Sequence, residues 1–534
     1  MQNILCLIPL IAAGAAILYF ISSYDSIPVN VDAGYYLSIS REVAGGATPT
    51  VDVITSYTPG VYYLFALWMK LAGTDFESSL LLVFFVHLLN CLLLYHLLGF
   101  FLKNAFFRTV LVISYFFSVY FLEGYSIALE PFQILFALSA YLAYLYWRSG
   151  TAGYVAAGFL FGCSVMCKQY SVILFAGFLV SVYLDSRGRD PWTVIIKRML
   201  ISVISAVCPY LIFIATTDAR ILDSLHDIAF LRRNPVFYMS QGRWDAAARV
   251  RDIVWKSLEV HWLFIPVLIY IISRSFRKDF ICPKTSIIPL MLASLTPLLV
   301  RQFSHYFQFI APWSFIILAV TLNDAYAGLK SAEMDNRYVL GSCIFCTAVM
   351  LPVSVFYSPY FTTDFYMNHK IQLFSVMALY LGSITLTIAM GMYRSGYPSG
   401  LRFLTLLATA LIFFEVIFIC LRLPLHDWKA QKTLQGVEAV NLHKVFPALT
   451  PVLVLGYPQL YITCNFVNPL HNYDVIFPEL GNIAMAVTDQ QWNRVRNVIV
   501  RREGLFGLRE EILRRGFMEI ESTETQHLLI FSRR

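Results

Sequence analysis

The chain has 534 residues, of which 58% are hydrophobic and only 14% are charged, and its formal net charge is +7. Soluble globular chains carry about 25% charged residues, so this composition excludes an ordinary soluble enzyme and makes the bilayer the solvent for most of the chain. The cations lie mainly in short segments between apolar runs, where they report membrane topology, so the positive charge gives no reason to expect a nucleic-acid partner.

Apolar runs along the chain predict about thirteen transmembrane helices, each of spanning length or slightly less. The first run, residues 4–21, lacks a basic leader region and a small-residue cleavage site, so we expect it to remain as an uncleaved span. The runs begin near residues 4, 79, 109, 131, 153, 170, 199, 262, 285, 306, 339, 371 and 403.

The positions of the cations assign the two sides of the membrane, because cytoplasmic loops are enriched in Lys and Arg. With the N-terminus in the cytoplasm, the inside loops carry Lys103, Arg108, Arg148, Arg187, Arg189, Lys197, Arg198, Arg274, Arg277, Lys278, Lys284, Lys330, Arg337, Arg394 and Arg402. The short outside loops carry Lys168, Arg301 and Lys370. This pattern favours two short helices broken at Lys168 within residues 153–184, since one long helix would reverse every later loop. It also places residues 422–534 outside the cytoplasm.

Two long outside loops, residues 23–78 and 217–261, and a polar C-terminal region complete the predicted architecture. The predicted elements of the C-terminal region are a strand at 452–456, a helix at 490–515 and two short strands within 517–531. The predicted fold class is therefore a mostly α, polytopic membrane protein. It has a transmembrane domain, residues 1–421, and a small C-terminal α/β domain, residues 422–534, outside the cytoplasm.

Three carboxylates lie near the outer ends of the predicted spans, where a polar group is costly and needs a reason. Asp32 opens a predicted amphipathic helix in the first outside loop, Asp52 follows it, and Glu130 precedes Pro131 at the start of a span. Each carboxylate also has a structural explanation. Asp32 and Glu130 suit helix caps, and Asp52 suits a solvated loop.

Cations lie on the same side of the membrane as these carboxylates. Lys168 is at the break between two short helices, and Arg301 and His305 are four residues apart, hence on one helical face. Snorkelling to lipid phosphates and interfacial anchoring are their structural alternatives. Together the carboxylates and the cations suit transfer chemistry in which a phosphate-linked lipid is the donor. A carboxylate can accept the acceptor's proton, and cations can stabilise the charge that builds on a departing phosphate.

An ordered set of motifs resembles the GT-C glycosyltransferases, in the branch of the protein O-mannosyltransferases and the lipid A aminoarabinose transferase. The matching motifs are Asp32-Ala33-Gly34-Tyr35-Tyr36, Gly46…Val51-Asp52…Tyr57-Thr58-Pro59-Gly60, Leu129-Glu130-Pro131, Gly162…Lys168-Gln169, Arg301…His305-Tyr306…Pro312 and Val454-Leu455-Gly456-Tyr457-Pro458. The resemblance covers essentially the whole chain, and the order of the motifs is more specific than any one of them.

The resemblance implies a polyprenyl-phosphate-linked sugar donor, an extracytoplasmic active site and inversion at the anomeric carbon. By this carry-over, Asp32 is the catalytic base, and Asp52 and Glu130 shape the acceptor or sugar pocket or hold a divalent metal. The residues implied for donor-phosphate binding are Lys168, Arg301, His305 and Tyr306.

Two departures from the family pattern leave the donor and the use of a metal open. Members of the family often have a second acidic residue directly after the first one, and this chain has Ala33 in that place. Many members also have a lysine near the second helix, where this chain has Tyr57-Thr58-Pro59. Another cation must then contact the phosphate. The loop at 217–261 offers Arg232, Arg233 and Arg243.

The sequence thus predicts a glycosyltransferase of a bacterial inner membrane, which moves a sugar from a polyprenyl-phosphate carrier to an envelope glycan, lipid or protein. A polytopic transporter or lipid flippase is the first alternative, although transporters place their polar site near the bilayer midplane. A non-catalytic assembly factor is the second, and it would tolerate loss of the carboxylates.

Overall fold

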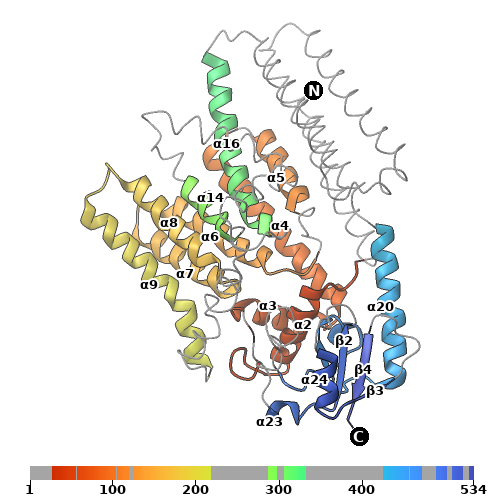
Figure 1. The fold of residues 1–534 in the computed structure, drawn as a ribbon. Coiled ribbons are helices and arrows are strands. Elements are labelled where there is room, and N and C mark those ends of the chain that lie inside the picture. The colour runs from red at the N-terminus through yellow and green to blue at the C-terminus, as the bar shows by residue number, and fades with distance from the viewer. Residues whose placement is uncertain are drawn as a thin grey trace, which may run out of the picture.

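The computed structural model is a bundle of helices with a small sheet at one end (Figure 1). The structure describes residues 27–53, 55, 57–103, 105–119, 126–217, 287–297, 306–331, 425–455, 457–471, 489–501, 508–520 and 528–533. The predicted spans that begin near residues 4, 262, 339, 371 and 403, the loop over 218–261 and the domain boundary at 421/422 lie outside the described residues.

The bundle is built from apolar helices in the order that the sequence predicts. They are α4 (Phe76–Phe101), α5 (Ala105–Val119), α6 (Glu130–Trp147), α7 (Thr151–Cys167), α8 (Ser171–Ser186), α9 (Trp192–Thr216), α14 (Ile288–Ser294) and α16 (Phe307–Ser331). Among the described helices, α4 and α9 are by length and composition able to cross a membrane, each with a mean hydropathy of 2.2. The total of thirteen spans therefore stays a prediction.

Helices α7 and α9 pack with their backbones in close approach, through glycines spaced four residues apart. A Cβ atom on Gly158 would lie 2.2 Å from the carbonyl oxygen of Ser202, and one on Gly162 would lie 2.3 Å from that of Ala206. Small residues at this spacing are the usual means of close helix packing in membranes. This contact aligns α7 with α9 and so fixes the position of the residues at the end of α7.

The first loop, predicted over residues 23–78, contains two helices, α2 (Val31–Ala44) and α3 (Gly60–Ala72). Pro59 is the N-cap of α3, where its fixed φ suits a helix start. Helix α2 differs from the amphipathic surface helix that was expected. Its residues are buried continuously from Ala33 to Ser40, because α3 covers one side and the C-terminal region covers another.

The C-terminal region forms a four-stranded sheet in the order β1-β2-β4-β3. The strands are β1 (Leu453–Leu455), β2 (Asn497–Arg501), β3 (Met518–Ile520) and β4 (Leu528–Ser532), and the helices are α20 (Leu425–Val445), α21 (Leu460–Thr463), α23 (Asp489–Trp492) and α24 (Leu508–Arg514). Strand β2 pairs in parallel with β1 and antiparallel with β4, and β3 pairs antiparallel with β4.

The predicted helix over residues 490–515 is wrong, although the strand near 452–456 and the two closing strands are confirmed. Residues 498–500 instead form the centre of β2, between α23 and α24. The run Val498-Ile499-Val500 is buried, and β-branched residues favour a strand that packs on both faces.

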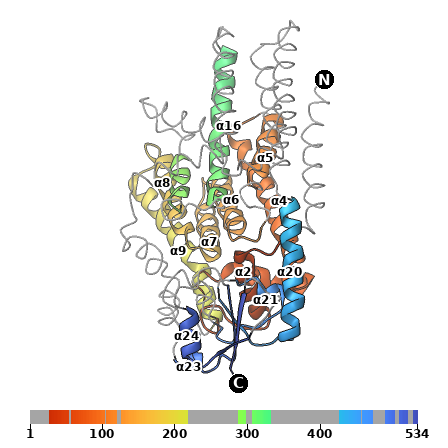
Figure 2. The same cartoon turned by 45° about the vertical axis from the view of Figure 1, so that its right-hand side comes forward.

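The sheet and α21 lie against α2 and α3 at one end of the bundle, as both views show (Figure 2). One hydrophobic core includes Tyr35 and Tyr62 from the first loop together with Val454 and Tyr461 from the C-terminal region. The two segments are far apart in sequence but share one packed core at this end of the molecule.

Candidate active site

A buried ion pair joins the start of α6 to the break between α7 and α8. Lys168 follows the last residue of α7 with an extended backbone, and α8 begins at Ser171, so the predicted break at Lys168 is confirmed. The ammonium of Lys168 contacts the carboxylate of Glu130, and each residue is only 2% exposed. Two buried charges are stable together only because each neutralises the other.

Hydrogen bonds hold the break against α6. The side chain of Gln133 donates to the hydroxyl of Ser171 at 2.7 Å, and the hydroxyl of Ser164 donates to the backbone carbonyl of Gln133 at 2.7 Å. The two hydroxyls are themselves 2.7 Å apart. Residues from both sides of the break thus bind one residue of α6, which keeps Lys168 opposite Glu130.

Three tyrosine rings surround the ammonium of Lys168. The nitrogen lies 4.6 Å from the ring centre of Tyr306, 5.7 Å from that of Tyr170 and 6.0 Å from that of Tyr57. Cations are attracted to the faces of aromatic rings at such distances. Burial alone lowers the pKa of Lys168, but Glu130 and the neighbouring tyrosines, Tyr57 first among them, outweigh burial and raise it. Lys168 is therefore charged at neutral pH.

Asp32 lies in the first turn of α2, but it is not the cap of that helix. Asn30 is the N-cap, and its side-chain oxygen accepts a hydrogen bond from the backbone N–H of Ala33 at 2.7 Å. The N-cap explanation for Asp32 is therefore wrong, because Asn30 occupies that position.

Tyr36 lies one helical turn after Asp32 on α2 and contacts Tyr57, which lies beside Lys168. Burial, Tyr57 and the charges of Asp32 and Glu130, in that order, raise the pKa of Tyr36 well above its ordinary value. The rings of Tyr36 and Tyr57 meet edge to face with their centres 5.6 Å apart. We call Asp32, Tyr36, Tyr57, Glu130 and Lys168 the carboxylate–tyrosine cluster; it holds two carboxylates and one cation around two phenols.

The C-terminal region positions the helix that carries Asp32. Arg41 of α2 donates to the backbone carbonyls of Tyr461 at 3.0 Å and Phe466 at 2.7 Å, and to the side-chain oxygen of Asn465 at 2.5 Å. A Cβ atom on Gly34 would lie 2.4 Å from the backbone nitrogen of Gln459. The backbone of α2 thus contacts the start of α21 directly, two residues from Asp32.

The structure brings together some of the predicted site residues and not others. Asp32, Glu130, Lys168 and Tyr306 lie in or beside the carboxylate–tyrosine cluster. Asp52 lies in an exposed turn and accepts a hydrogen bond from the backbone N–H of Thr48 at 2.8 Å. Arg301, His305, Arg232, Arg233 and Arg243 lie outside the described residues.

Tyr36, Tyr57 and Tyr170 were given no role from the sequence. The chain contains 32 tyrosines, so residue type alone does not distinguish these three. Their proximity to predicted site residues along the chain was the available signal, since Tyr36 is one helical turn after Asp32 and Tyr170 is two residues after Lys168.

The residues of the cluster do not fit a bound metal as they are arranged. Lys168 places its ammonium against Glu130, in the position where a divalent cation would have to sit. Among the described residues there is no group of three His, Cys, Asp or Glu side chains with the geometry to hold a metal ion. The positive charge beside Glu130 in this structure is that of Lys168.

Comparisons with known proteins identify the fold. No family model and no curated protein sequence matches the chain. The structure is similar to the crystal structure of ArnT from Cupriavidus metallidurans in the apo state, with a TM-score of 0.62, 12% identity, and coverage of 98% of this chain and 97% of ArnT. It is also similar to ArnT bound to undecaprenyl phosphate, with a TM-score of 0.59, 13% identity and the same coverage. The resemblance drawn from the motifs is thus confirmed at the level of architecture, because the chain shares the fold of ArnT over nearly its whole length.

Proposed function

We propose that this chain is a glycosyltransferase that moves a sugar from a polyprenyl-phosphate-linked donor to an acceptor of the bacterial cell envelope. The observation that carries the proposal is the set of contacts that joins α2 to the buried Lys168–Glu130 pair: the ring of Tyr36 contacts that of Tyr57, Tyr57 lies beside the ammonium of Lys168, and Asp32 is one helical turn before Tyr36. A pair of carboxylates and a cation at one end of a GT-C bundle suits this chemistry. The similarity to ArnT bound to undecaprenyl phosphate supports a donor of this kind.

In the proposed reaction, Asp32 accepts the proton of an acceptor hydroxyl as that oxygen attacks the anomeric carbon of the sugar. The bond between the anomeric carbon and the phosphate oxygen breaks, and the polyprenyl phosphate leaves with the electron pair. A phosphate is a good leaving group, so the reaction needs only the base. Attack from the side opposite the phosphate inverts the configuration of the anomeric carbon.

The Glu130–Lys168 pair would act on this reaction through charge and position. Lys168 carries its positive charge within the cluster at neutral pH, where it can stabilise negative charge that develops on the donor phosphate. Arg301, His305 and Tyr306 remain the other proposed phosphate contacts, and Asp52 the proposed acceptor-side residue. We place the site on the extracytoplasmic face of the inner membrane, because the cation pattern puts the C-terminal domain there.

The variant Asp32→Asn tests the proposal, because it keeps the size of the side chain and removes the base. Mass profiles of envelope glycans and lipids would be compared between deletion strains rescued by wild type or by the variant at equal protein level. We expect one sugar mass to disappear from one envelope component. Loss of a general base typically costs a factor of about 100 to 10,000 in rate.

Asp489→Asn is the matched control, because the side chain of Asp489 is 89% exposed in the C-terminal region. We expect this variant to restore the wild-type profile. Near-normal transfer by Asp32→Asn would remove Asp32 as the base. An unchanged profile in the full deletion, with movement of labelled lipid by the purified protein in vesicles, would instead support a flippase.

A further inference from the structure

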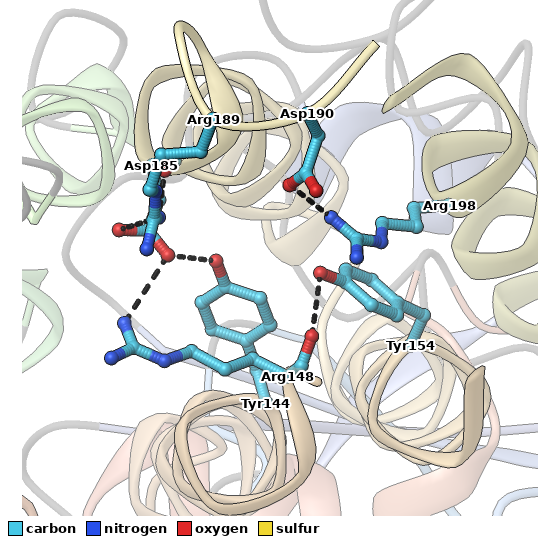
Figure 3. Close-up of polar contacts among 7 residues, drawn as sticks. All are labelled: Tyr144, Arg148, Tyr154, Asp185, Arg189, Asp190 and Arg198. Atoms are coloured by element: carbon cyan, nitrogen blue, oxygen red, sulfur yellow. Dashed lines mark hydrogen bonds and ion pairs between the residues drawn. The ribbon is translucent and has the colours of Figure 1, made fainter. Parts of the chain in front are cut away.

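A second polar cluster lies at the opposite ends of the helices that carry the ion pair, and Figure 3 shows it. Helix α6 begins at Glu130 and has 18 residues, which span about 27 Å at 1.5 Å per residue. Arg148 follows its last residue. The hydrocarbon core of a bilayer is about 30 Å thick, so this cluster lies at the other membrane interface from the proposed active site.

The centre of this cluster is the buried carboxylate of Asp185, which is 5% exposed. It accepts a hydrogen bond from the hydroxyl of Tyr144 at 2.7 Å and forms ion pairs with Arg148 at 3.3 Å and Arg189 at 2.7 Å (Figure 3). The second carboxylate, Asp190, pairs with Arg198 at 2.5 Å. Both carboxylates of the cluster are therefore ion-paired within it.

Two further cations at this interface are exposed. Arg187 ends α8, and Lys197 lies in the second turn of α9. Neither has an ion-pair partner among the described residues. At this end of α6, α8 and α9, five cations accompany the two carboxylates Asp185 and Asp190, which leaves an excess of three positive charges. These cations are Arg148, Arg187, Arg189, Lys197 and Arg198.

The outward face of α9 continues this positive end with an apolar stripe. The exposed fractions along it are 55% for Leu200, 66% for Ile204 and 51% for Leu211. Lys197 precedes these residues by three, seven and fourteen positions, so it lies on the same face of the helix. Trp192, which is 63% exposed, begins the helix at the level where tryptophans mark the membrane interface.

We propose that Arg187 and Lys197 bind the headgroup phosphate of an anionic phospholipid, whose acyl chains lie along the apolar stripe of α9. The bilayer offers this occupant at the right depth, and the excess positive charge complements it. Arg148 and Arg189, about half exposed, add to the field while they hold Asp185. This lipid site is separate from the proposed active site and does not depend on the proposed transfer reaction.

Binding of phosphatidylglycerol to the purified full-length protein tests the proposal. The affinity would be measured from the shift of the unfolding temperature in detergent, with phosphatidylcholine as the neutral lipid, and bound lipid would be counted by native mass spectrometry. We expect phosphatidylglycerol to bind and phosphatidylcholine to be washed away. Each of Arg187→Gln and Lys197→Gln should weaken binding about fivefold, and the double variant about 30-fold.

Lys103→Gln is the matched control, because Lys103 is an exposed cation just after the end of α4. This end of α4 lies beside the end of α6, since the ring centres of Phe100 and Tyr146 are 5.0 Å apart. We expect it to change the affinity less than twofold. Equal weakening by Lys103→Gln would overturn the site, since the lipid would then bind the whole basic interface.

Two further arms make the outcome decisive. In the first, inorganic phosphate is added to the protein with phosphatidylcholine. If it raises the unfolding temperature as much as phosphatidylglycerol does, the site binds a soluble phosphate, and the assignment to a lipid is overturned. The conservative double variant Arg187→Lys with Lys197→Arg keeps both charges, so it should retain binding. If it loses binding as completely as the double glutamine variant, the charges are not the basis of recognition, and the proposal fails.

Discussion

The buried pair of Glu130 and Lys168 makes a prediction at the scale of single residues. Glu130→Gln leaves an ammonium buried without its counter-charge, so we expect the free energy of unfolding to fall by about 3 to 5 kcal/mol. The double variant Glu130→Gln with Lys168→Met removes both charges and should recover much of that loss. Thermal unfolding of the single and double variants in detergent gives the coupling energy. If the losses of unfolding free energy in Glu130→Gln and Lys168→Met simply add in the double variant, the two side chains are not coupled.

Much of the candidate site could be predicted residue by residue, because buried charges in a membrane chain are few and each needs a reason. Glu130 and Lys168 stand out in this way, Asp32 stands out as a charge near a predicted span, and Tyr306 came only from the family resemblance. Their arrangement could not be predicted. Lys168 lies 38 positions from Glu130 in the chain, and only the packing of α6 on α7 shows that it neutralises this carboxylate. The sequence shows which side chains carry a charge near a predicted span, whereas tertiary packing decides which other side chains they contact.

At the scale of helices, the contact of α2 with α21 depends on the absence of a side chain at Gly34. In Gly34→Ala, the new Cβ atom would lie 2.4 Å from the nitrogen and 2.5 Å from the Cα atom of Gln459, and these backbone atoms must move. We expect a loss of about 1 to 3 kcal/mol, measured by thermal unfolding. Gly436→Ala in α20 is the control, because nothing lies within 4 Å of its Cβ position. It should be neutral or stabilising by up to about 1 kcal/mol. Equal effects of the two changes would contradict the tight contact.

Elements differ in how well the sequence predicts them, for physical reasons. The break at Lys168 is predictable because cations are costly in the bilayer and sort to its sides. The strand β2 is not, because its neighbours on either side favour a helix, and residues 490–515 read as one helical segment. Pairing with β1 and β4 overrides that local preference.

At the scale of the whole molecule, the C-terminal region and the first loop form one structural unit. They share a hydrophobic core, and Lys432 of α20 pairs with Glu77 of α4 at 2.7 Å. The start of α4 is thus at the same end as the sheet, while the end of α8 and the start of α9, which carry the Asp185 cluster, lie away from it (Figure 1). Among the described ends of the bundle helices, those near the sheet carry the carboxylate–tyrosine cluster, whereas those near Asp185 carry more cations than carboxylates.

This polarity predicts the orientation in the membrane, which labelling of single cysteines can test. Cysteine would be introduced at Arg514, whose side chain is 72% exposed in the C-terminal region, and separately at the exposed Arg187 near the Asp185 cluster. Cytoplasmic loops attract cations, so an impermeant maleimide should label Arg514→Cys and not Arg187→Cys in right-side-out vesicles. Inverted vesicles should give the opposite pattern, and the unsubstituted protein measures the background from native cysteines. The reverse result would place the carboxylate–tyrosine cluster in the cytoplasm, where an acceptor of the outer envelope could not reach it.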